Sequence, residues 1–172
     1  HTGNVLQPSC NIASNITAVE QTGPDDFFIG TESGLYRAKL EKHPLSLSCM
    51  PAYNLRVTIS ELFFSADLNK LFIGTSKQGV WIFSPDSPSG IHSDETFGDV
   101  NITRIVPFNK DEVLIATDGK GIYRMDVDSC RAVPYIVADY TAHYGMNDNN
   151  INDIYVDAKA RIWIANYFNG IT

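Results

Sequence analysis

The sequence predicts an all-β fold made of β-propeller blades, each blade being a four-stranded antiparallel sheet. Three observations carry this prediction: a strand-like motif occurs four times, a glycine follows each copy at a nearly fixed offset, and the repeat is 42 to 49 residues long. Four strands in about 40 to 50 residues are typical of propellers. Helical repeats of that length would show a 3.6-residue periodicity, which is absent, and β-helix or leucine-rich repeats would be shorter.

The repeated motif is a run of bulky residues followed by small ones. It reads FFIGT at 27–31, LFIGT at 71–75, VLIAT at 113–117 and IWIAN at 162–166. We interpret each copy as a strand of β-branched and aromatic residues. The small residue in fourth place is explained by a lack of room near the centre of a propeller, and tolerance of a β-bulge is the alternative. This place is taken by Gly30, Gly74, Ala116 and Ala165.

A hairpin and two further strands can be placed around each copy of the motif. A glycine lies five or six residues beyond the central isoleucine, and β-branched or aromatic residues follow it as a return strand. These glycines are Gly34, Gly79, Gly121 and Gly170. A first strand is expected to start at residues 16–17, 57–58, 102–103 and 151–152.

The four units are expected to form part of one propeller domain, with approximate repeats 12–54, 55–99, 100–146 and 147–172. The last repeat stops at the start of its third strand. The sequence therefore predicts a partial propeller of about three and a half blades with an exposed edge. We expect the remaining blades in other parts of a longer chain.

Composition narrows the class of function. The chain has 172 residues and is 44% hydrophobic, which is enough for a core. Its net charge of −7 disfavours nucleic acid as a partner, because phosphates require a basic surface. No run approaches the roughly 18 apolar residues that cross a bilayer, so membrane contact is expected only through other parts of the chain. Trp81 and Trp163 are interpreted as fillers between blades.

The three cysteines suggest neither zinc binding nor a disulfide framework. Cys10, Cys49 and Cys130 show no metal-ligand spacing and fall in different units at no recurring offset. We therefore expect three free thiols.

No catalytic or metal-binding constellation can be assembled from the remaining motifs, and we expect no cofactor. The four histidines lack partners at ligand spacing and are expected on the surface; they are His1, His43, His92 and His143. The acidic pair Asp25 and Asp26 is interpreted as part of a hairpin turn, and Asp67 and Asp157 recur in the equivalent turns, which favours turn chemistry over catalysis. The acidic and amide residues of 147–153 lack the central glycine and terminal glutamate of an EF-hand, so loop capping is favoured over calcium binding.

The chain resembles the two-component regulator propeller repeat. The resemblance is carried by GMNDNNINDIYVD at 145–157, IWIA at 162–165 and NGI at 169–171, with matching second halves at 73–81 and 115–124. It spans about residues 15–172. The copies depart from the pattern at Ala160, which replaces the turn glycine, at Asn166, which replaces a threonine, and at 109–111.

The resemblance implies the periplasmic sensor region of a hybrid two-component system that detects glycan breakdown products and regulates polysaccharide utilisation. It implies a small polar ligand such as an oligosaccharide, and further blades and downstream domains of the same receptor as neighbours. It also allows a homodimer. A non-catalytic propeller scaffold that binds other proteins is the alternative, for which an exposed apolar patch would be the sign.

The ligand is expected on the face where the loops between second and third strands meet the loops that lead into first strands. Aromatic, amide and charged groups at these tips suit a sugar, although polar loop tips are also common without a ligand. The face should also carry 32–33, Asp99 and 147–150. The candidate ligand-binding residues are Arg56, Lys77, Gln78, Asp118, Lys120, Asn149, Tyr167 and Phe168.

Overall fold

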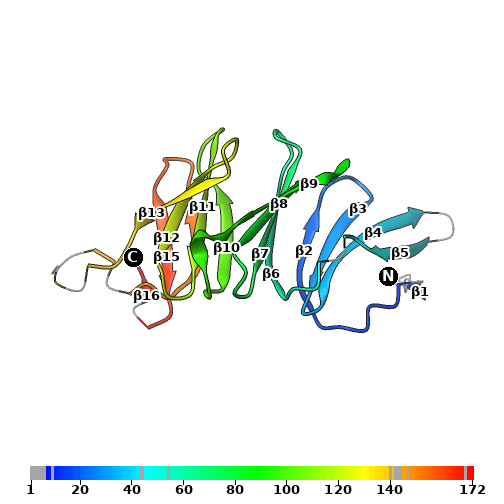
Figure 1. Ribbon diagram of the computed structural model, residues 1–172, viewed down its shortest axis with the longest axis horizontal. Helices are drawn as coiled ribbons and strands as arrows, with labels where there is room; N and C mark the ends of the chain where they lie inside the picture. Colours follow the sequence, from blue (N-terminus) through cyan, green and yellow to red (C-terminus); the bar gives the residue numbers. More distant parts are fainter. Residues whose placement is uncertain are drawn as a thin grey trace, which may run out of the picture.

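The computed structural model describes residues 7–8, 10–42, 45–53, 55–139, 141, 145–146, 148–168 and 170–172, without the side chains of residues 7, 8 and 87–94. In these residues the chain forms four β-sheets that follow one another along the sequence (Figure 1). From β2 onward, consecutive strands within each sheet pair antiparallel. The predicted all-β propeller fold is confirmed.

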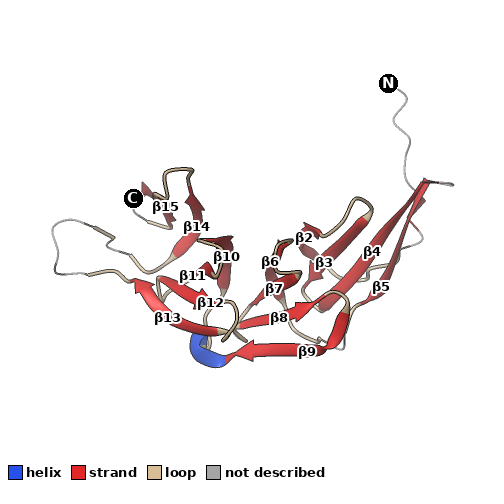
Figure 2. Ribbon diagram, turned by 90° about the horizontal axis from the view of Figure 1, so that it is seen from above, coloured by secondary structure: helices blue, strands red, loops and turns tan. Residues whose placement is uncertain are grey.

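The first sheet contains β1 (Gln7–Pro8), β2 (Ile16–Gln21), β3 (Asp26–Thr31), β4 (Gly34–Lys42) and β5 (Leu45–Pro51). The second contains β6 (Ile59–Ser65), β7 (Lys70–Thr75), β8 (Val80–Ser84) and β9 (Ser87–Asp94), followed by a 3-10 turn, η1 (Glu95–Phe97). The third contains β10 (Ile102–Pro107), β11 (Glu112–Thr117), β12 (Ile122–Asp126) and β13 (Arg131–Ile136). The fourth contains β14 (Ile151–Val156), β15 (Ile162–Asn166) and β16 (Gly170–Ile171). From above, the sheets form an arc with β2, β6, β10 and β14 along its inner side (Figure 2).

The four units share one strand register. The first residue of each first strand pairs with the last residue of the repeated motif: Ile16 with Thr31, Ile59 with Thr75, Ile102 with Thr117 and Ile151 with Asn166. An irregularity in the register follows each of these isoleucines. The first strand of the second unit therefore begins at Ile59, and the predicted start at 57–58 is wrong, because only Ile59 occupies the place opposite the threonine.

Neighbouring sheets pack through an isoleucine and a small residue. Ile102 is fully buried at the start of β10, and its Cγ2 atom would lie 2.6 Å from a Cβ atom on Gly74 of the preceding sheet. Ala116 and Ile151 belong to one buried cluster at the next interface. The predicted packing role of the small residue is confirmed: it leaves room for the isoleucine of the next sheet.

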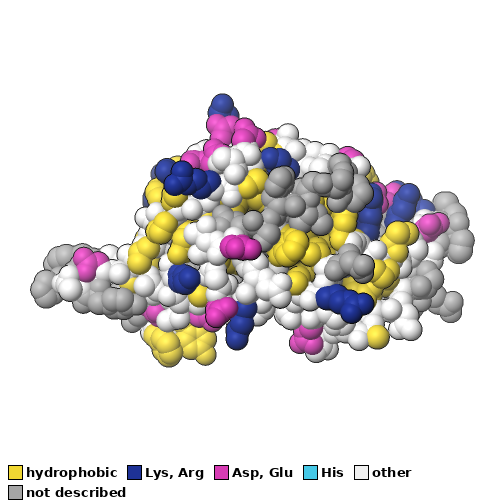
Figure 3. All heavy atoms as spheres, in the orientation of Figure 1, with side chains coloured by type: hydrophobic (Ala, Val, Ile, Leu, Met, Phe, Trp, Pro, Cys, Tyr) yellow, Lys and Arg dark blue, Asp and Glu magenta, His cyan; other side chains and the backbone are white. Residues whose placement is uncertain are grey.

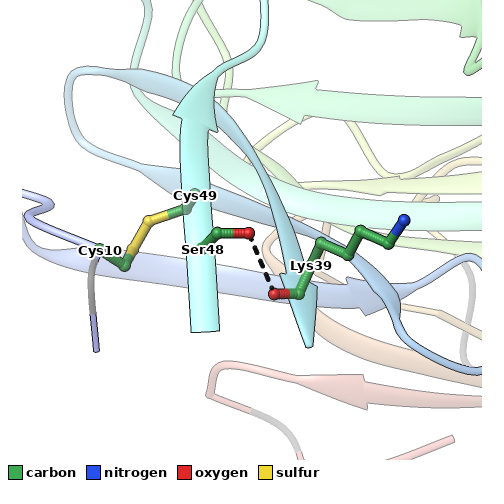
Figure 4. The surroundings of a disulfide bond; sticks show 4 residues. All are labelled: Cys10, Lys39, Ser48 and Cys49. Atoms are coloured by element: carbon green, nitrogen blue, oxygen red, sulfur yellow. Dashed lines mark hydrogen bonds between the residues drawn. A yellow bond between two sulfur atoms is a disulfide. The ribbon is translucent and has the colours of Figure 1, made fainter. Parts of the chain in front are cut away.

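The N-terminal segment adds a fifth strand to the first sheet, and the expectation of three free thiols is wrong. β1 runs parallel to β5, with Gln7 beside Ser46. The same register brings Cys10 beside Cys49, with Cα atoms 5.0 Å apart, and the two side chains form a disulfide (Figure 4). Cys130 keeps its thiol, which lies 3.6 Å from the carbonyl oxygen of Val127. The spacing between units could not reveal this bond because β1 lies outside the repeat.

Candidate functional site

A buried threonine fixes the hairpin between second and third strands in each of the first three sheets. In the second sheet, the Thr75 hydroxyl donates to the carbonyl oxygen of Gly79 at 2.7 Å and accepts the N–H of Gln78 at 3.1 Å. Thr31 and Thr117 make the equivalent pair of bonds in their hairpins. These tips are therefore held in place by the strand that carries them.

A cavity lies beside the second of these hairpins, between β7 and β8. It has a volume of about 290 Å³. The β7–β8 hairpin and β8 form one wall, and η1 with the residues after it forms the other. The lining residues are Lys77, Gln78, Gly79, Trp81, Glu95, Gly98 and Asp99.

Backbone and side-chain contacts hold both walls. Lys77 has a φ of 72°, a conformation that residues other than glycine rarely adopt, and its N–H donates to the carbonyl oxygen of Val100 at 3.3 Å. The Lys120 ammonium, which comes from the next sheet, donates to the carbonyl oxygen of Phe97 at 2.8 Å. Phe97 is fully buried, and its ring packs edge-on against Tyr123 at 4.9 Å between centroids. The second and third sheets together shape this cavity.

The lining groups suit a polar ligand of low net charge. The ammonium of Lys77 and the amide of Gln78 can donate hydrogen bonds, and the carboxylates of Glu95 and Asp99 can accept them. The half-buried indole of Trp81 supplies an aromatic surface. Within the described residues, the Trp81 Nε1–H is buried without a hydrogen-bond partner. On the face of the molecule that Figure 3 shows, acidic and basic side chains are interspersed, and no large patch carries charges of one sign only.

A smaller cavity of about 110 Å³ occupies the equivalent place beside the first hairpin. It is lined by 33–36, Pro51, Tyr53, Leu55 and Arg56. Beside the third hairpin, Asn149 fills that place: its carbonyl oxygen accepts the N–H groups of Gly119 and Gly121, each at 3.0 Å, and its side chain accepts the N–H of Ala138 at 2.8 Å. The first two hairpins thus border cavities of different size.

The structure brings together only some of the residues predicted for a ligand site. Lys77, Gln78 and Asp99 line the large cavity. Arg56 lines the smaller one. Lys120 does not line the cavity, but its ammonium holds the backbone of Phe97 in the cavity wall. Asn149 connects two loops through its hydrogen bond with the N–H of Ala138.

The remaining predicted residues lie away from the large cavity. The Asp118 N–H donates to the carbonyl oxygen of Asn101 at 3.0 Å, and the backbone of Asp118 forms an isolated antiparallel β-bridge with Asn150. Tyr167 and Phe168 are exposed at the β15–β16 turn, two sheets away, with their rings 4.7 Å apart. Asn147 and three of the histidines, His1, His43 and His143, lie outside the described residues.

The side chains of Trp81 and Glu95 were not assigned to a ligand site from the sequence. Trp81 was interpreted as a filler between blades; it does pack against the buried cluster shared by the first and second sheets, and it also lines the cavity. Glu95 was not singled out. The signal for Trp81 was its place in the return strand, where it pairs with Ile73. Tyr36 and Tyr123 occupy the same place in the first and third units. Glu95 lies in η1, which has no counterpart in the repeat.

A row of charged side chains connects the inner strands of three sheets and was also missed. Arg104 on β10 contacts Glu61 on β6 at 3.1 Å and Asp153 on β14 at 3.3 Å. Each of the three charged residues lies two residues beyond the first isoleucine of its strand. This shared position can be recognised only once the strand register is known. Burial raises the pKa of Glu61 to about 7, against the opposing effect of Arg104. Burial also raises the pKa of Glu20, whose carboxylate accepts the N–H of Phe64 at 2.8 Å.

Over the described residues there is no cluster of histidine, cysteine or acidic side chains that could hold a metal ion. No helix in the same part of the chain is long and apolar enough to span a membrane.

Comparisons with known proteins place the fold. No protein-family model and no curated protein matches the chain. Among solved structures, it superposes on the extracellular domain of BT4673 from B. thetaiotaomicron with a TM-score of 0.71 and 20% identity, over 91% of this chain and 21% of that one. BT4673 is described as a hybrid two-component system in one crystal structure and as a one-component system in another.

Two further structures show the same arrangement of sheets. The extracellular domain of the hybrid two-component system BT3049 from B. thetaiotaomicron gives a TM-score of 0.71 at 16% identity, over 92% of this chain and 20% of that one. The computationally designed Ika4 protein gives 0.65 at 16% identity, over 96% of this chain and 94% of that one. The chain therefore spans about a fifth of the two bacterial domains, and the likeness at these identities establishes the fold.

Proposed function

We propose that this chain is a ligand-sensing segment of an extracytoplasmic β-propeller, and that its ligand is a small polar molecule of the oligosaccharide class. The observation that carries the proposal is the cavity of about 290 Å³ on the loop face, where Trp81 lies among hydrogen-bonding side chains. Sugars bind through an aromatic surface together with amide and carboxylate groups. The cavity offers this combination.

Two further observations support a sensor in the periplasm. The chain shares its fold with extracellular domains of B. thetaiotaomicron two-component systems. The Cys10–Cys49 disulfide is typical of oxidising compartments. The parent protein would be a hybrid histidine kinase and response regulator that controls polysaccharide utilisation, and the ligand would need different affinities for its two signalling states.

The alternative is a non-catalytic propeller scaffold that binds proteins. The exposed pair Tyr167 and Phe168 is the observation in its favour, because exposed aromatic residues are common at protein interfaces. A scaffold would use this turn and leave the cavity empty.

Calorimetric titration of the chain with a panel of glycan-derived oligosaccharides tests the proposal. We expect at least one oligosaccharide to bind. Lys77→Ala and Asp99→Asn should each lower the affinity about tenfold, because each variant removes a hydrogen bond to the ligand. Lys110→Ala, at an exposed lysine in the β10–β11 turn, is the matched control and should leave affinity unchanged. Binding that ignores both cavity variants, or no binding by any oligosaccharide, would contradict the proposal.

A further inference from the structure

We infer that the large cavity selects sugars that carry an amino group, and that Glu95 and Asp99 hold the ammonium of the ligand beside the indole of Trp81. This inference rests on the proposed function, because it concerns the ligand of the same cavity. It goes further in naming the group that the ligand must carry. Three features of the cavity support it: its two walls differ in chemistry, its charged groups are unpaired, and an aromatic ring lies among them.

The two walls of the cavity carry side chains of different chemistry. The wall formed by the β7–β8 hairpin presents the ammonium of Lys77 and the amide of Gln78. The other wall, formed by η1 (drawn in blue in Figure 2) and the residues after it, presents the carboxylates of Glu95 and Asp99. An ionised carboxylate only accepts hydrogen bonds, so this second wall requires donor groups from the ligand.

The charged groups of the cavity are available to a ligand. Elsewhere in the chain opposite charges pair directly, as Arg104 does with Glu61 at 3.1 Å. Over the residues that the structure describes, Lys77, Glu95 and Asp99 form no ion pair with one another or with another side chain. All three are exposed. A cation that enters the cavity therefore finds two carboxylates without a competing partner.

The balance of charge favours a cation over an anion. Two carboxylates and one ammonium line the cavity. The ammonium of Lys120 does not line it and already donates to the carbonyl oxygen of Phe97 at 2.8 Å. A uronic acid would therefore gain an attraction to Lys77 alone, and the carboxylates of Glu95 and Asp99 would repel it.

Trp81 adds a second attraction for the same group. The face of an indole is the best aromatic partner for an ammonium ion. The Trp81 ring is half-buried and lines the same cavity as the two carboxylates. A neutral hydroxyl in the place of the ammonium would make a weaker hydrogen bond to a carboxylate and would gain little from the ring. An amino sugar thus fits this cavity better than the corresponding neutral sugar.

Calorimetric titration of the chain with four disaccharides at about pH 6, where an amine of this kind carries its proton, tests the inference. Chitobiose, its diacetyl form and cellobiose share one backbone and carry an amine, an acetamide and a hydroxyl at the same ring position. The fourth probe is the diglucuronic acid with the same linkage, which carries carboxylates. We expect chitobiose to bind about tenfold more tightly than cellobiose or the acetamide, and the diglucuronic acid to bind most weakly.

Two variants remove the charge of the acidic wall and keep the shape of its side chains. Glu95→Gln and Asp99→Asn should each reduce the advantage of chitobiose over cellobiose, and the double variant should abolish it. Added salt should reduce the same advantage in the wild type, because it screens exposed charges. Asp67→Asn is the matched control: it removes the same charge from the exposed β6–β7 turn, at the other end of β7, and should leave the advantage unchanged.

Circular dichroism of each variant identifies any loss of fold. Chitobiose that binds no more tightly than cellobiose, or an advantage that survives the double variant, would overturn the inference and leave the proposed function standing. Failure of all four disaccharides to bind would also overturn it. The wider panel of oligosaccharides then decides the proposed function separately.

Discussion

The Cγ2 atom of Ile59 lies 2.5 Å from the position that a Cβ atom would take on Gly30. This is the interface between the first and second sheets, and a methyl group at Gly30 would collide with the side chain that fills it. The small residue of the repeat is therefore a requirement of the neighbouring sheet.

Gly30→Ala should lower the free energy of unfolding by about 1 to 3 kcal/mol, because overpacking a filled interface forces a shift of backbone or side chain. Urea titration measures the change. Gly23→Ala is the control, because a Cβ atom there would meet only Asp26 at an ordinary 3.6 Å, and its effect should stay within about 0.5 kcal/mol. Equal effects of the two changes would contradict this account of the interface.

Ala160→Gly should stabilise the protein by about 1 kcal/mol. Ala160 stands where the repeat expects a glycine and has a φ of 59°, a left-handed conformation that costs a residue with a Cβ atom free energy. Thermal unfolding measures the gain. Ala158→Gly, in the same turn, should give no gain, because Ala158 is not among the residues with positive φ. A loss of stability in both variants would contradict this account, because glycine would then relieve no strain at position 160 and would only make the unfolded chain more flexible.

Glu61→Gln should change how stability depends on pH. The folded state raises the pKa of Glu61 from 4.5 to about 7, so between these values the folded chain binds a proton that the unfolded chain has lost. The wild type should therefore lose stability relative to the variant as pH rises from about 4.5 to about 7. We expect a relative loss of about 2 kcal/mol, after allowing for screening at the half-exposed Arg104.

Denaturant titrations of both proteins at several pH values measure this difference. Below pH 4 the glutamate and the glutamine are both neutral, so the two curves should run parallel there. A gap that stays constant up to pH 8 would show that Glu61 titrates normally.

Thiol titration of the denatured, unreduced chain should find one thiol, from Cys130, and three after reduction. Reduction should release β1 from β5 and lower stability by about 3 to 4 kcal/mol, the chain-entropy value for a loop of this length. Cys130→Ser, which removes no crosslink, is the control and should leave no titratable thiol before reduction. Three thiols in the unreduced chain would contradict the disulfide.

The repeat predicts most of the fold because packing between sheets imposes the same residue types at the same places. The motif strands, their hairpins and the small residue opposite the next isoleucine all follow from the amino-acid pattern. The start of β6 was misplaced because 57–58 also looks like a strand start, and only pairing with Thr75 distinguishes Ile59.

The candidate site was less predictable because it depends on what differs between units. Lys77 and Gln78 could be found from the hairpin, but η1 and Glu95 have no repeated counterpart. Lys120 belongs to the same class of hairpin as Gln78, yet its ammonium reaches the backbone of Phe97. The disulfide likewise depends on a strand outside the repeat.

The fluorescence of Trp81 during ligand titration is the most direct test of the sensor site. In a Trp163→Phe background Trp81 is the sole tryptophan, and it lines the cavity. We predict that its emission changes and saturates at the concentration at which calorimetry shows oligosaccharide binding, and that Lys77→Ala shifts both midpoints together. Saturable binding in calorimetry with no change in Trp81 emission would place the ligand elsewhere and contradict the account.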